Sequence, residues 1–389
     1  MTVTMVAACP LPSPRGTPLR IARMAEALAA RGHRVHLVTY HLGEGRVGGG
    51  VRVHRIPDVP FYRRTSPGPT WSKLALVDPL LAWKVGKVVR AHPPDVIHAH
   101  HYEGLLVALP FRRRAPVVFD AHTLLESELP HYSLIPGRAA ERRLGRWIDR
   151  VLPPRADHVI AVTERLRERL LAAGRTAAER ITVIGNGVEP TLFRPTRGSG
   201  NGRTLVYAGN LAPYQGVEVM LDAVGRVGER EDDIRLVLAL PPGARPDEVL
   251  GQAAERGLHG RVEVVSVGIT ELPGVLAAAD VALHPRPPCD GLPMKLLNYM
   301  AAALPVVSFR GSARGLEHGR SAWIVEDGDV EGFAEGIVRL LRDRELARRL
   351  GTEARARVAR EGSWERTATD VETVYRKLTL YGARSRPYD

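Results

Sequence analysis

Short apolar runs and helical patterns alternate along the chain, beginning within its first forty residues. The apolar run VTMVAA (3 to 8) predicts a strand, and the turn-rich loop PLPSPRG follows it. Apolar residues then recur at helical spacing at Ile21, Met24 and Leu28, until Gly32 ends the helix. Because RVHLVTY (34 to 40) predicts a second strand, the segment forms a βαβ unit whose strands are parallel and buried.

The alternation continues to the end of the chain in two series. The first series continues with the predicted strands DVIHAH (95 to 100), PVVFDAH (116 to 122), HVIAVT (158 to 163) and ITVIGNG (181 to 187). Residues 57 to 73, rich in proline, aromatic residues and arginine, predict a long loop instead. After the glycine-rich and polar stretch LFRPTRGSGNGR comes the second series: TLVYAG (204 to 209), RLVLAL (235 to 240), RVEVVS (261 to 266), DVALHP (280 to 285), PVVSF (305 to 309) and AWIV (322 to 325). Three helical segments finish the chain.

This order predicts an α/β protein with two doubly wound, parallel-sheet (Rossmann-like) domains that face each other across a cleft. We expect the first domain at 1–194, a linker at 195–203 and the second domain at 204–363. A last helix at 364–389 should pack back on the first domain. Ligands of such sheets bind at the carboxyl ends of the strands, so the candidate chemistry should lie in the loops that follow strands.

Composition narrows the class of protein. With 44% hydrophobic and 25% charged residues among 389, the chain is typical of a soluble globular protein. No run approaches 18 apolar residues and no secretory signal is apparent, while two distant cysteines, Cys9 and Cys289, fit a reducing cytoplasm. The net charge of +12 favours an anionic partner or simply reflects an arginine-rich background. No zinc spacing, aromatic RNP pattern or basic heptad region suggests nucleic acid.

Several segments, taken in order, resemble the retaining glycosyltransferases of family 4 over nearly the whole chain. They are PSPRGTPLRIARMAEALAARGHRVHLVT, PDVIHAH, VVFDAHT, ADHVIAVTERLRERL, ITVIGNGVEPTLFRP, VYAGNLAPYQG, LAAADVALHP, GLPMKLLNYMAAALPVV and SAWIVEDGD. The resemblance implies the GT-B fold and the transfer of a sugar from a nucleotide-diphosphate donor to an acceptor hydroxyl, with retention of the anomeric configuration. It implies no metal ion and no cofactor besides the nucleotide sugar, and the sequence shows no clustered His, Cys and Asp ligands.

In the first domain the resemblance assigns roles to Gly16, Thr17 and His122. Gly16, in PRGT, allows the backbone to approach a ligand and precedes a helix N-terminus that favours an anion, and Thr17 follows it. His122 ends a buried strand where the family has a histidine against the transferred sugar, so we expect it to be catalytic through hydrogen bonding. Three further histidines in IHAHH are weaker candidates, one for the cleft and the others for packing or the surface: His98, His100 and His101.

The first loop of the second domain departs from the family pattern. The family usually has an arginine and a lysine there, which grip the donor diphosphate, whereas this chain has Asn210 and Gln215. Their amides still donate hydrogen bonds but carry no charge. Because a hydrogen bond to a charged group contributes about 1.5–3 kcal/mol, the replacement predicts a weaker grip on the diphosphate. The remaining cations are Arg286, in a neighbouring loop, and Lys295, at the predicted start of a helix, where we expect a phosphate contact.

The stretch DGLPMKLLNYMA (290 to 301) forms the second half of the predicted donor site. The family has two glutamates with seven residues between them, and Asp290 and Asn298 occupy those places. We expect Asp290 to accept hydrogen bonds from the donor sugar and count it with the catalytic residues. An amide offers one acceptor to the two hydroxyls of a ribose, so a glutamate at Asn298 would hold the ribose better. Gly291, Leu292 and Met294 complete the predicted donor site.

A basic helical segment raises a membrane hypothesis. Residues 138 to 150, RAAERRLGRWIDR, carry five arginines, and an apolar stripe at helical spacing is formed by Leu144, Trp147, Ile148 and Val151. The nearby loop YRRTSPGPTWSKLAL adds Trp71 and Lys73. An ordinary core-facing helix with a basic outer face gives the same pattern. On the membrane hypothesis the protein binds the anionic inner face of the membrane and its acceptor is a lipid-linked sugar or glycolipid.

The sequence therefore predicts a cytoplasmic, metal-independent glycosyltransferase of the hexosyltransferase type. Its partners are a nucleotide-sugar donor and a sugar or glycolipid acceptor, and no nucleic acid. Two alternatives remain open because of the altered donor loop: a catalytically degenerate ligand-binding protein, and a transferase with an unusual donor.

Overall fold

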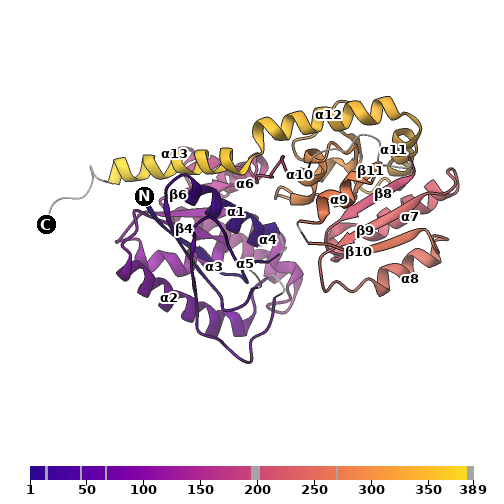
Figure 1. Cartoon of the computed structure of the whole chain (residues 1–389). Coiled ribbons are helices and arrows are strands. Elements are labelled where there is room, and N and C mark those ends of the chain that lie inside the picture. Colours follow the sequence, from indigo (N-terminus) through magenta and orange to yellow (C-terminus); the bar gives the residue numbers. More distant parts are fainter. Residues whose placement is uncertain (14–15, 44–45, 66–67, 194–201, 269, 383–389) are drawn as a thin grey trace. The chain divides into compact units, whose positions relative to one another are not determined.

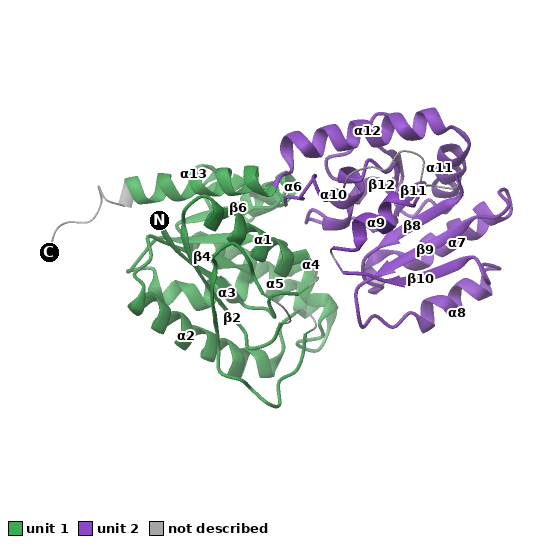
Figure 2. Ribbon diagram, viewed as in Figure 1, with its two compact units in different colours: residues 1–186, 364–389 green, residues 187–363 purple. Residues whose placement is uncertain are grey.

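A computed structural model of the chain describes residues 1–13, 16–43, 46–65, 68–193, 202–268 and 270–382. The chain forms two compact units, residues 1–186 together with 364–389, and residues 187–363 (Figures 1 and 2). The linker predicted at 195–203 lies, up to residue 201, outside the described residues, and Gly202 and Arg203 belong to the second unit.

The first unit is built on a sheet of seven parallel strands in the order β3-β2-β1-β4-β5-β6-β7. Their bounds are β1 Thr2–Ala7, β2 Arg34–Thr39, β3 Arg52–Arg55, β4 Val96–His100, β5 Val117–Ala121, β6 His158–Ala161 and β7 Ile181–Val183. The strand order reverses between β1 and β4, which is where doubly wound sheets bind their ligands. The side chains of β1, β4, β5 and β6 are buried throughout, as expected of a sheet covered on both faces.

Helices cover both faces of this sheet (Figure 1). They are α1 Gly16–Ala30, α2 Asp78–Ala91, α3 His101–Ala108, α4 Leu125–Glu128, α5 Arg138–Val151, α6 Glu164–Ala172 and α13 Trp364–Gly382, with a π-helical turn at Lys73–Val77 and 3-10 turns at Leu109–Phe111, Leu129–His131, Pro153–Arg155 and Ala178–Arg180. One face packs against α2, α3 and α6 and the other against α1 and α13. Tyr375 of α13 is fully buried there, and Arg31 pairs with Glu372 at 2.6 Å. The last helix therefore belongs to the first unit.

The second unit repeats the architecture with six parallel strands in the order β10-β9-β8-β11-β12-β13. Its strands are β8 Thr204–Ala208, β9 Arg235–Leu240, β10 Val262–Ser266, β11 Val281–His284, β12 Val306–Phe309 and β13 Trp323–Val325. Its helices are α7 Val217–Gly228, α8 Asp247–Glu255, α9 Leu272–Ala277, α10 Met294–Ala301, α11 Val330–Arg342 and α12 Arg344–Glu361, with 3-10 turns at Pro213–Gln215 and Arg310–Ser312. Two apolar clusters fill the two faces of the sheet. The prediction of two doubly wound parallel sheets is confirmed.

Each predicted strand has a counterpart in the structure, but β3 was not predicted from the sequence. Its sequence, RVHR, has a single aliphatic residue, and its side chains are exposed or half-buried because the strand lies at the edge of the sheet. Apolar alternation is weak in such a strand, so only pairing with β2 reveals it. The loop predicted at 57 to 73 contains no strand among its described residues.

Helix α5 turns a polar face to the protein, so the single apolar stripe predicted for it is wrong in part. Its buried residues are Glu141, Gly145 and Asp149. The Asp149 carboxylate accepts the backbone N–H groups of residues 125 and 126, and that of Glu141 accepts those of residues 134 and 135. Leu144 and Ile148 are half-buried, whereas Trp147 is 61% exposed among arginines. No helix among the described residues is long and apolar enough to cross a membrane.

Candidate active site

Three predicted or candidate residues of the first unit meet where the strand order reverses. Gly16 begins α1 after β1, His101 begins α3 directly after β4, and His122 follows β5. Since β1, β4 and β5 are adjacent parallel strands, their carboxyl ends share one edge of the sheet. Gly16 is exposed, whereas Thr17 and His122 are half-buried.

Thr17 joins two imidazoles at this edge. Its Oγ1 lies 3.2 Å from Nε2 of His101 and 3.5 Å from Nδ1 of His122. The two imidazole rings stack with centroids 4.6 Å apart and planes 18° apart. Within IHAHH the sequence pattern does not distinguish His101 from His98 and His100; only the turn into α3 brings it beside His122.

A buried ion pair between Arg20 and Asp120 lies next to this cluster. Nε and Nη2 of Arg20 each donate to a different oxygen of Asp120 at 3.0 Å, and both side chains are essentially inaccessible to water. Oδ2 of Asp120 also lies 3.4 Å from Nε2 of His122. Although burial opposes its ionisation, Arg20 and His122 hold the pKa of Asp120 well below its usual range. Burial lowers the pKa of His122 to about 4 against the attraction of Asp120, so this imidazole is neutral at pH 7.

His98, His100 and Asp120 have a spacing that could hold a metal ion, because their ligand atoms lie within 4.8 Å of one another. Two contacts argue against a metal there. Arg20 already places a positive charge on both carboxylate oxygens, and Nδ1 of His98 lies 2.6 Å from the Tyr375 hydroxyl. A dication beside a buried guanidinium would be repelled, so the trio is better explained as part of the hydrogen-bonded network under His122.

In the second unit the corresponding edge is formed by the ends of β8 and β11. Gly209 follows β8 with φ 146°, and a Cβ there would lie 3.0 Å from Cε and Nζ of Lys295. Gly216 precedes α7 with φ 72°, and its Cβ would lie only 2.1 Å from the carbonyl oxygen of Pro285. Both glycines are therefore required for the loop between them to pack against the end of β11 and against Lys295.

Lys295 is the centre of a network that unites three predicted residues. Its Nζ donates to the Tyr207 hydroxyl at 2.8 Å and to Oε1 of Gln215 at 2.9 Å, and it lies 4.0 Å above the Tyr207 ring. Tyr207 donates in turn to the Asn210 carbonyl at 2.6 Å, and Nε2 of Gln215 donates to Oδ1 of Asn210 at 3.3 Å. Tyr207 was missed because its sequence position is that of an ordinary buried strand residue.

The charge of Lys295 is not neutralised within the described residues, since its hydrogen-bond partners are an amide and a phenol. Burial, together with repulsion from Arg286, holds the pKa of Lys295 well below its usual range. A bound anion would raise this pKa and favour the ammonium form, so the network is suited to a phosphate.

The other predicted donor residues surround this network. Asp290, in the loop before α10, and Asn298, within α10, are each only 6% exposed. The Arg286 guanidinium lies 5.4 Å from the centre of the Tyr214 ring. Three further predicted residues are half-buried at the start of α10 or just before it: Gly291, Leu292 and Met294.

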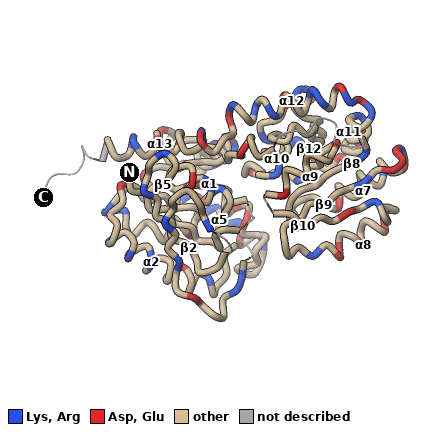
Figure 3. The backbone as a smooth tube through the Cα atoms, viewed as in Figure 1, with Lys and Arg blue, Asp and Glu red and all other residues tan. Residues whose placement is uncertain are grey.

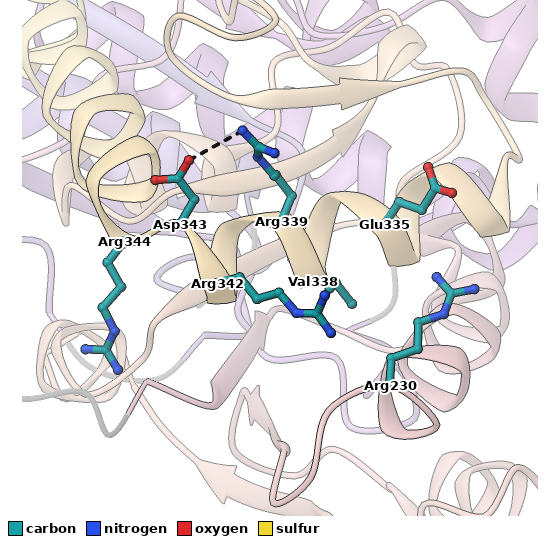
Figure 4. A pocket seen from close by; sticks show the side chains of 7 residues that line it. All are labelled: Arg230, Glu335, Val338, Arg339, Arg342, Asp343 and Arg344. Atoms are coloured by element: carbon teal, nitrogen blue, oxygen red, sulfur yellow. Dashed lines mark hydrogen bonds and ion pairs between the residues drawn. The ribbon is translucent and has the colours of Figure 1, made fainter.

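A pocket of about 600 Å³ lies elsewhere on the second unit, at the end of α11 (Figure 4). It is lined by Arg230, Glu335, Val338, Arg339, Arg342, Asp343 and Arg344. Three of its arginines already have acidic partners: Arg230 pairs with Glu331, Arg342 with Glu231 and Arg339 with Asp343. No predicted site residue lines this pocket, so we do not assign the chemistry to it.

Comparison with known proteins agrees with the geometry of both units. Residues 14–192 match the profile of Glycosyltransferase Family 4, and residues 202–343 match that of Glycosyl transferases group 1. A D-inositol 3-phosphate glycosyltransferase of Corynebacterium glutamicum (strain R) is 24% identical over 303 residues, which are 72% of each chain.

Solved structures show the same fold at low identity. A sucrose-phosphate synthase from Thermosynechococcus elongatus is 20% identical, covers 98% of this chain and 99% of its own, and has a TM-score of 0.82. Anabaena HepE in complex with UDP-glucose is 19% identical, covers 97% of this chain and 100% of its own, and has a TM-score of 0.74. Both units thus have the fold of GT-B enzymes, and the chain belongs to glycosyltransferase family 4.

Proposed function

We propose that the protein transfers a hexosyl group from a nucleotide-diphosphate sugar to an acceptor hydroxyl, with retention of configuration and without a metal ion. The observation that carries this proposal is the Lys295 network. Among the described residues the Lys295 amino group hydrogen-bonds only to an amide and a phenol, at the edge of the sheet where doubly wound units bind ligands. An ammonium group held in this way favours a diphosphate.

In this proposal each predicted residue has a distinct contact. Lys295 and the backbone N–H groups at the start of α10 bind the diphosphate, Asp290 accepts from sugar hydroxyls and Asn298 faces the ribose. In the first unit, Gly16 and Thr17 contact the ligand, and Nδ1 of His122 exchanges its 3.5 Å contact with the Thr17 hydroxyl for a hydrogen bond at the reaction centre. The leaving phosphate itself accepts the acceptor's proton, so no protein nucleophile is needed.

Related proteins suggest which substrates to try first. HepE binds UDP-glucose in its structure, and the Corynebacterium relative is named for D-inositol 3-phosphate. UDP-glucose and D-inositol 3-phosphate are therefore the first donor and acceptor of the proposed panel. Lipid-linked sugars and glycolipids form its second group of acceptors.

The glycolipid acceptors of the panel are included because of the arginines of α5; Figure 3 marks the Lys and Arg positions along the backbone. Arg142, Arg143 and Arg146 are exposed there beside the exposed indole of Trp147. The indole of Trp71 is 65% exposed, and its N–H donates to the carbonyl of Leu134, just before α5. Exposed indoles among arginines favour an anionic membrane surface, so we propose peripheral binding there.

The alternative is a ligand-binding protein that has lost turnover. The uncharged Asn210 and Gln215 favour it, because they replace the two cations that the family usually has in this loop.

Calorimetric titration with UDP, GDP, ADP and UDP-glucose, followed by turnover assays with and without EDTA, separates these functions. We expect a nucleoside diphosphate to bind and its sugar to be transferred or slowly hydrolysed equally in EDTA. Binding without hydrolysis or transfer from any donor would support the degenerate protein, and no binding would contradict both. Loss of activity in EDTA would contradict the metal-independent mechanism.

A further inference from the structure

His101 has a left-handed backbone conformation, with φ 60°, at the first residue of α3. This conformation is uncommon for residues other than glycine and costs free energy. Gly104, three residues later, shows why the turn is tight: a Cβ there would lie 3.0 Å from the carbonyl oxygen of Val6. Helix α3 therefore packs directly on β1, and His101 is the single residue in which the chain turns from β4 into the helix.

The neighbours of His101 determine which of its nitrogens carries a proton. Nε2 of His122 is buried without a hydrogen-bond partner, and the Asp120 carboxylate, whose Oδ2 lies 3.4 Å away, favours the neutral tautomer with the proton on this nitrogen. Nδ1 of His122 is then an acceptor, and the Thr17 hydroxyl, 3.5 Å away, donates to it. The Thr17 oxygen in turn accepts from Nε2 of His101 at 3.2 Å. Burial lowers the pKa of His101, so its second nitrogen, Nδ1, carries a lone pair and no proton.

Nδ1 of His101 is free to accept a hydrogen bond. It has no hydrogen-bond partner among the described residues, and it is not one of the polar atoms that are buried without a partner. Both nitrogens of His122, by contrast, face protein atoms. At this edge of the sheet, the accessible acceptor of the stacked imidazole pair therefore belongs to His101.

We propose that Nδ1 of His101 accepts a hydrogen bond from a substrate hydroxyl, on the donor sugar or on the acceptor. The left-handed turn places the imidazole beside Thr17 and His122. If this position served only the turn, glycine or asparagine would adopt the same backbone conformation at a lower cost in free energy. Strain retained at a ligand-facing residue is typical of functional sites. The proposal rests on the proposed glycosyl transfer, because a hydroxyl is what both substrates of that reaction offer.

The variant His101→Gly removes the imidazole and accepts the left-handed backbone without strain. Asp233→Gly is the matched control, because Asp233 is exposed and has a similar φ of 56° far along the chain. Both variants should melt at the wild-type temperature or above it. With UDP-glucose and D-inositol 3-phosphate, or the substrates that turn over in the panel, kcat/KM should fall at least about tenfold in His101→Gly only, as for a positioned proton-accepting group.

Two assays identify the hydroxyl. A fall in donor hydrolysis as well as transfer assigns it to the donor sugar, whereas a fall in transfer alone, with a raised KM for the acceptor, assigns it to the acceptor. Transfer within about twofold of wild type in a stable His101→Gly protein would overturn the proposal. His101→Asn, which also tolerates this backbone and offers a carbonyl oxygen as acceptor beside its NH2 donors, should recover part of the loss.

Which nitrogen of His101 carries the proton can be tested by a measurement that does not require turnover. In the ¹⁵N-histidine spectrum of the wild-type chain, the signals lost in His101→Gly should show Nε2 protonated and Nδ1 unprotonated. A protonated Nδ1 at pH 7.5 would overturn the proposal whatever the kinetics show. If the wild-type protein turns over no donor, the proposed function fails, and this spectrum alone decides the assignment of His101.

Discussion

Nζ of Lys295 lies 2.9 Å from Oε1 of Gln215, the side chain that stands where the resemblance to family 4 implies a lysine. Helix α10 thus brings a basic side chain to the loop after β8, which contains no lysine or arginine of its own between Gly209 and Gly216. Tyr207 holds the same ammonium group from the end of β8, both as a hydrogen-bond partner and through its ring. The loop after β8 and α10 are therefore joined in one hydrogen-bonded network, to which we assign the donor, although 80 residues separate Gln215 from Lys295.

Replacing Lys295 by alanine should weaken the binding of a nucleoside diphosphate by about 1.5–3 kcal/mol, the range of a hydrogen bond to a charged group. The nucleoside alone should bind almost as before, because it carries no phosphate. Titration of both ligands against wild type and Lys295→Ala measures the difference. Equal weakening of both ligands would show that Lys295 supports the fold and does not bind phosphate.

A companion change on the same helix is Asn298→Glu. If Asn298 faces the ribose, a carboxylate there accepts from both hydroxyls and should tighten nucleoside and nucleoside diphosphate alike. Since Asn298 is only 6% exposed, the new charge should also lower the melting temperature of the free protein. Unchanged nucleoside affinity would place the ribose elsewhere.

The variant His122→Ala should lower transfer at least about a hundredfold, the range for a positioned catalytic group. Nucleoside-diphosphate affinity should be unchanged, because that ligand is assigned to the second unit. His131→Ala, at an exposed histidine of the same unit, serves as the control. Normal turnover in His122→Ala would remove His122 from the mechanism.

Acid should destabilise the fold through its buried histidines. Burial lowers the pKa of His36, His122 and His158 to about 4, so they are neutral in the folded state, while the unfolded chain protonates them below about pH 6.5. The stabilisation is full above pH 6.5 and is lost as the pH falls toward 4. Each histidine contributes a slope of about 1.4 kcal/mol per pH unit between these values.

Urea unfolding between pH 6.5 and 5 measures that slope. His158→Gln keeps a hydrogen bond toward Thr182, whose hydroxyl lies 2.8 Å from His158, and removes the titrating group. The pH dependence of its free energy of unfolding should be smaller than that of wild type by about 1.4 kcal/mol per pH unit, the contribution of one histidine. An equal slope in both proteins would show that His158 titrates normally.

Replacing Arg142, Arg143 and Arg146 by glutamine should weaken sedimentation with vesicles that contain anionic lipid, most strongly at low salt. The control removes the same charge from an exposed part of α12, with Arg344, Arg348 and Arg349 changed to glutamine. If the wild type ignores such vesicles at low salt, or if both triple variants lose binding equally, α5 is not a membrane surface.

The sequence by itself determined the two sheets, and it placed the predicted donor residues in the loops after strands and at the start of α10. Buried parallel strands are nearly continuous apolar runs, and the loops after them carry the glycines and polar residues, so local patterns sufficed for β1, β8 and α10. The same reasoning failed at β3, whose edge position leaves little apolar signal, and at α5, where Glu141 and Asp149 are buried because they accept backbone N–H groups.

Only the tertiary structure decided which of these residues act together. Tyr207 and Lys295 are far apart in sequence and meet because β8 lies beside β11, the strand that precedes α10. His101 differs from its neighbours His98 and His100 only through its left-handed turn and the contact with Thr17. The proton positions proposed for His101 and His122, too, depend on Asp120, which is held by Arg20 from 100 residues away in the sequence. Periodicity reflects local conformation and burial, whereas such contacts depend on how distant strands are ordered in the sheet.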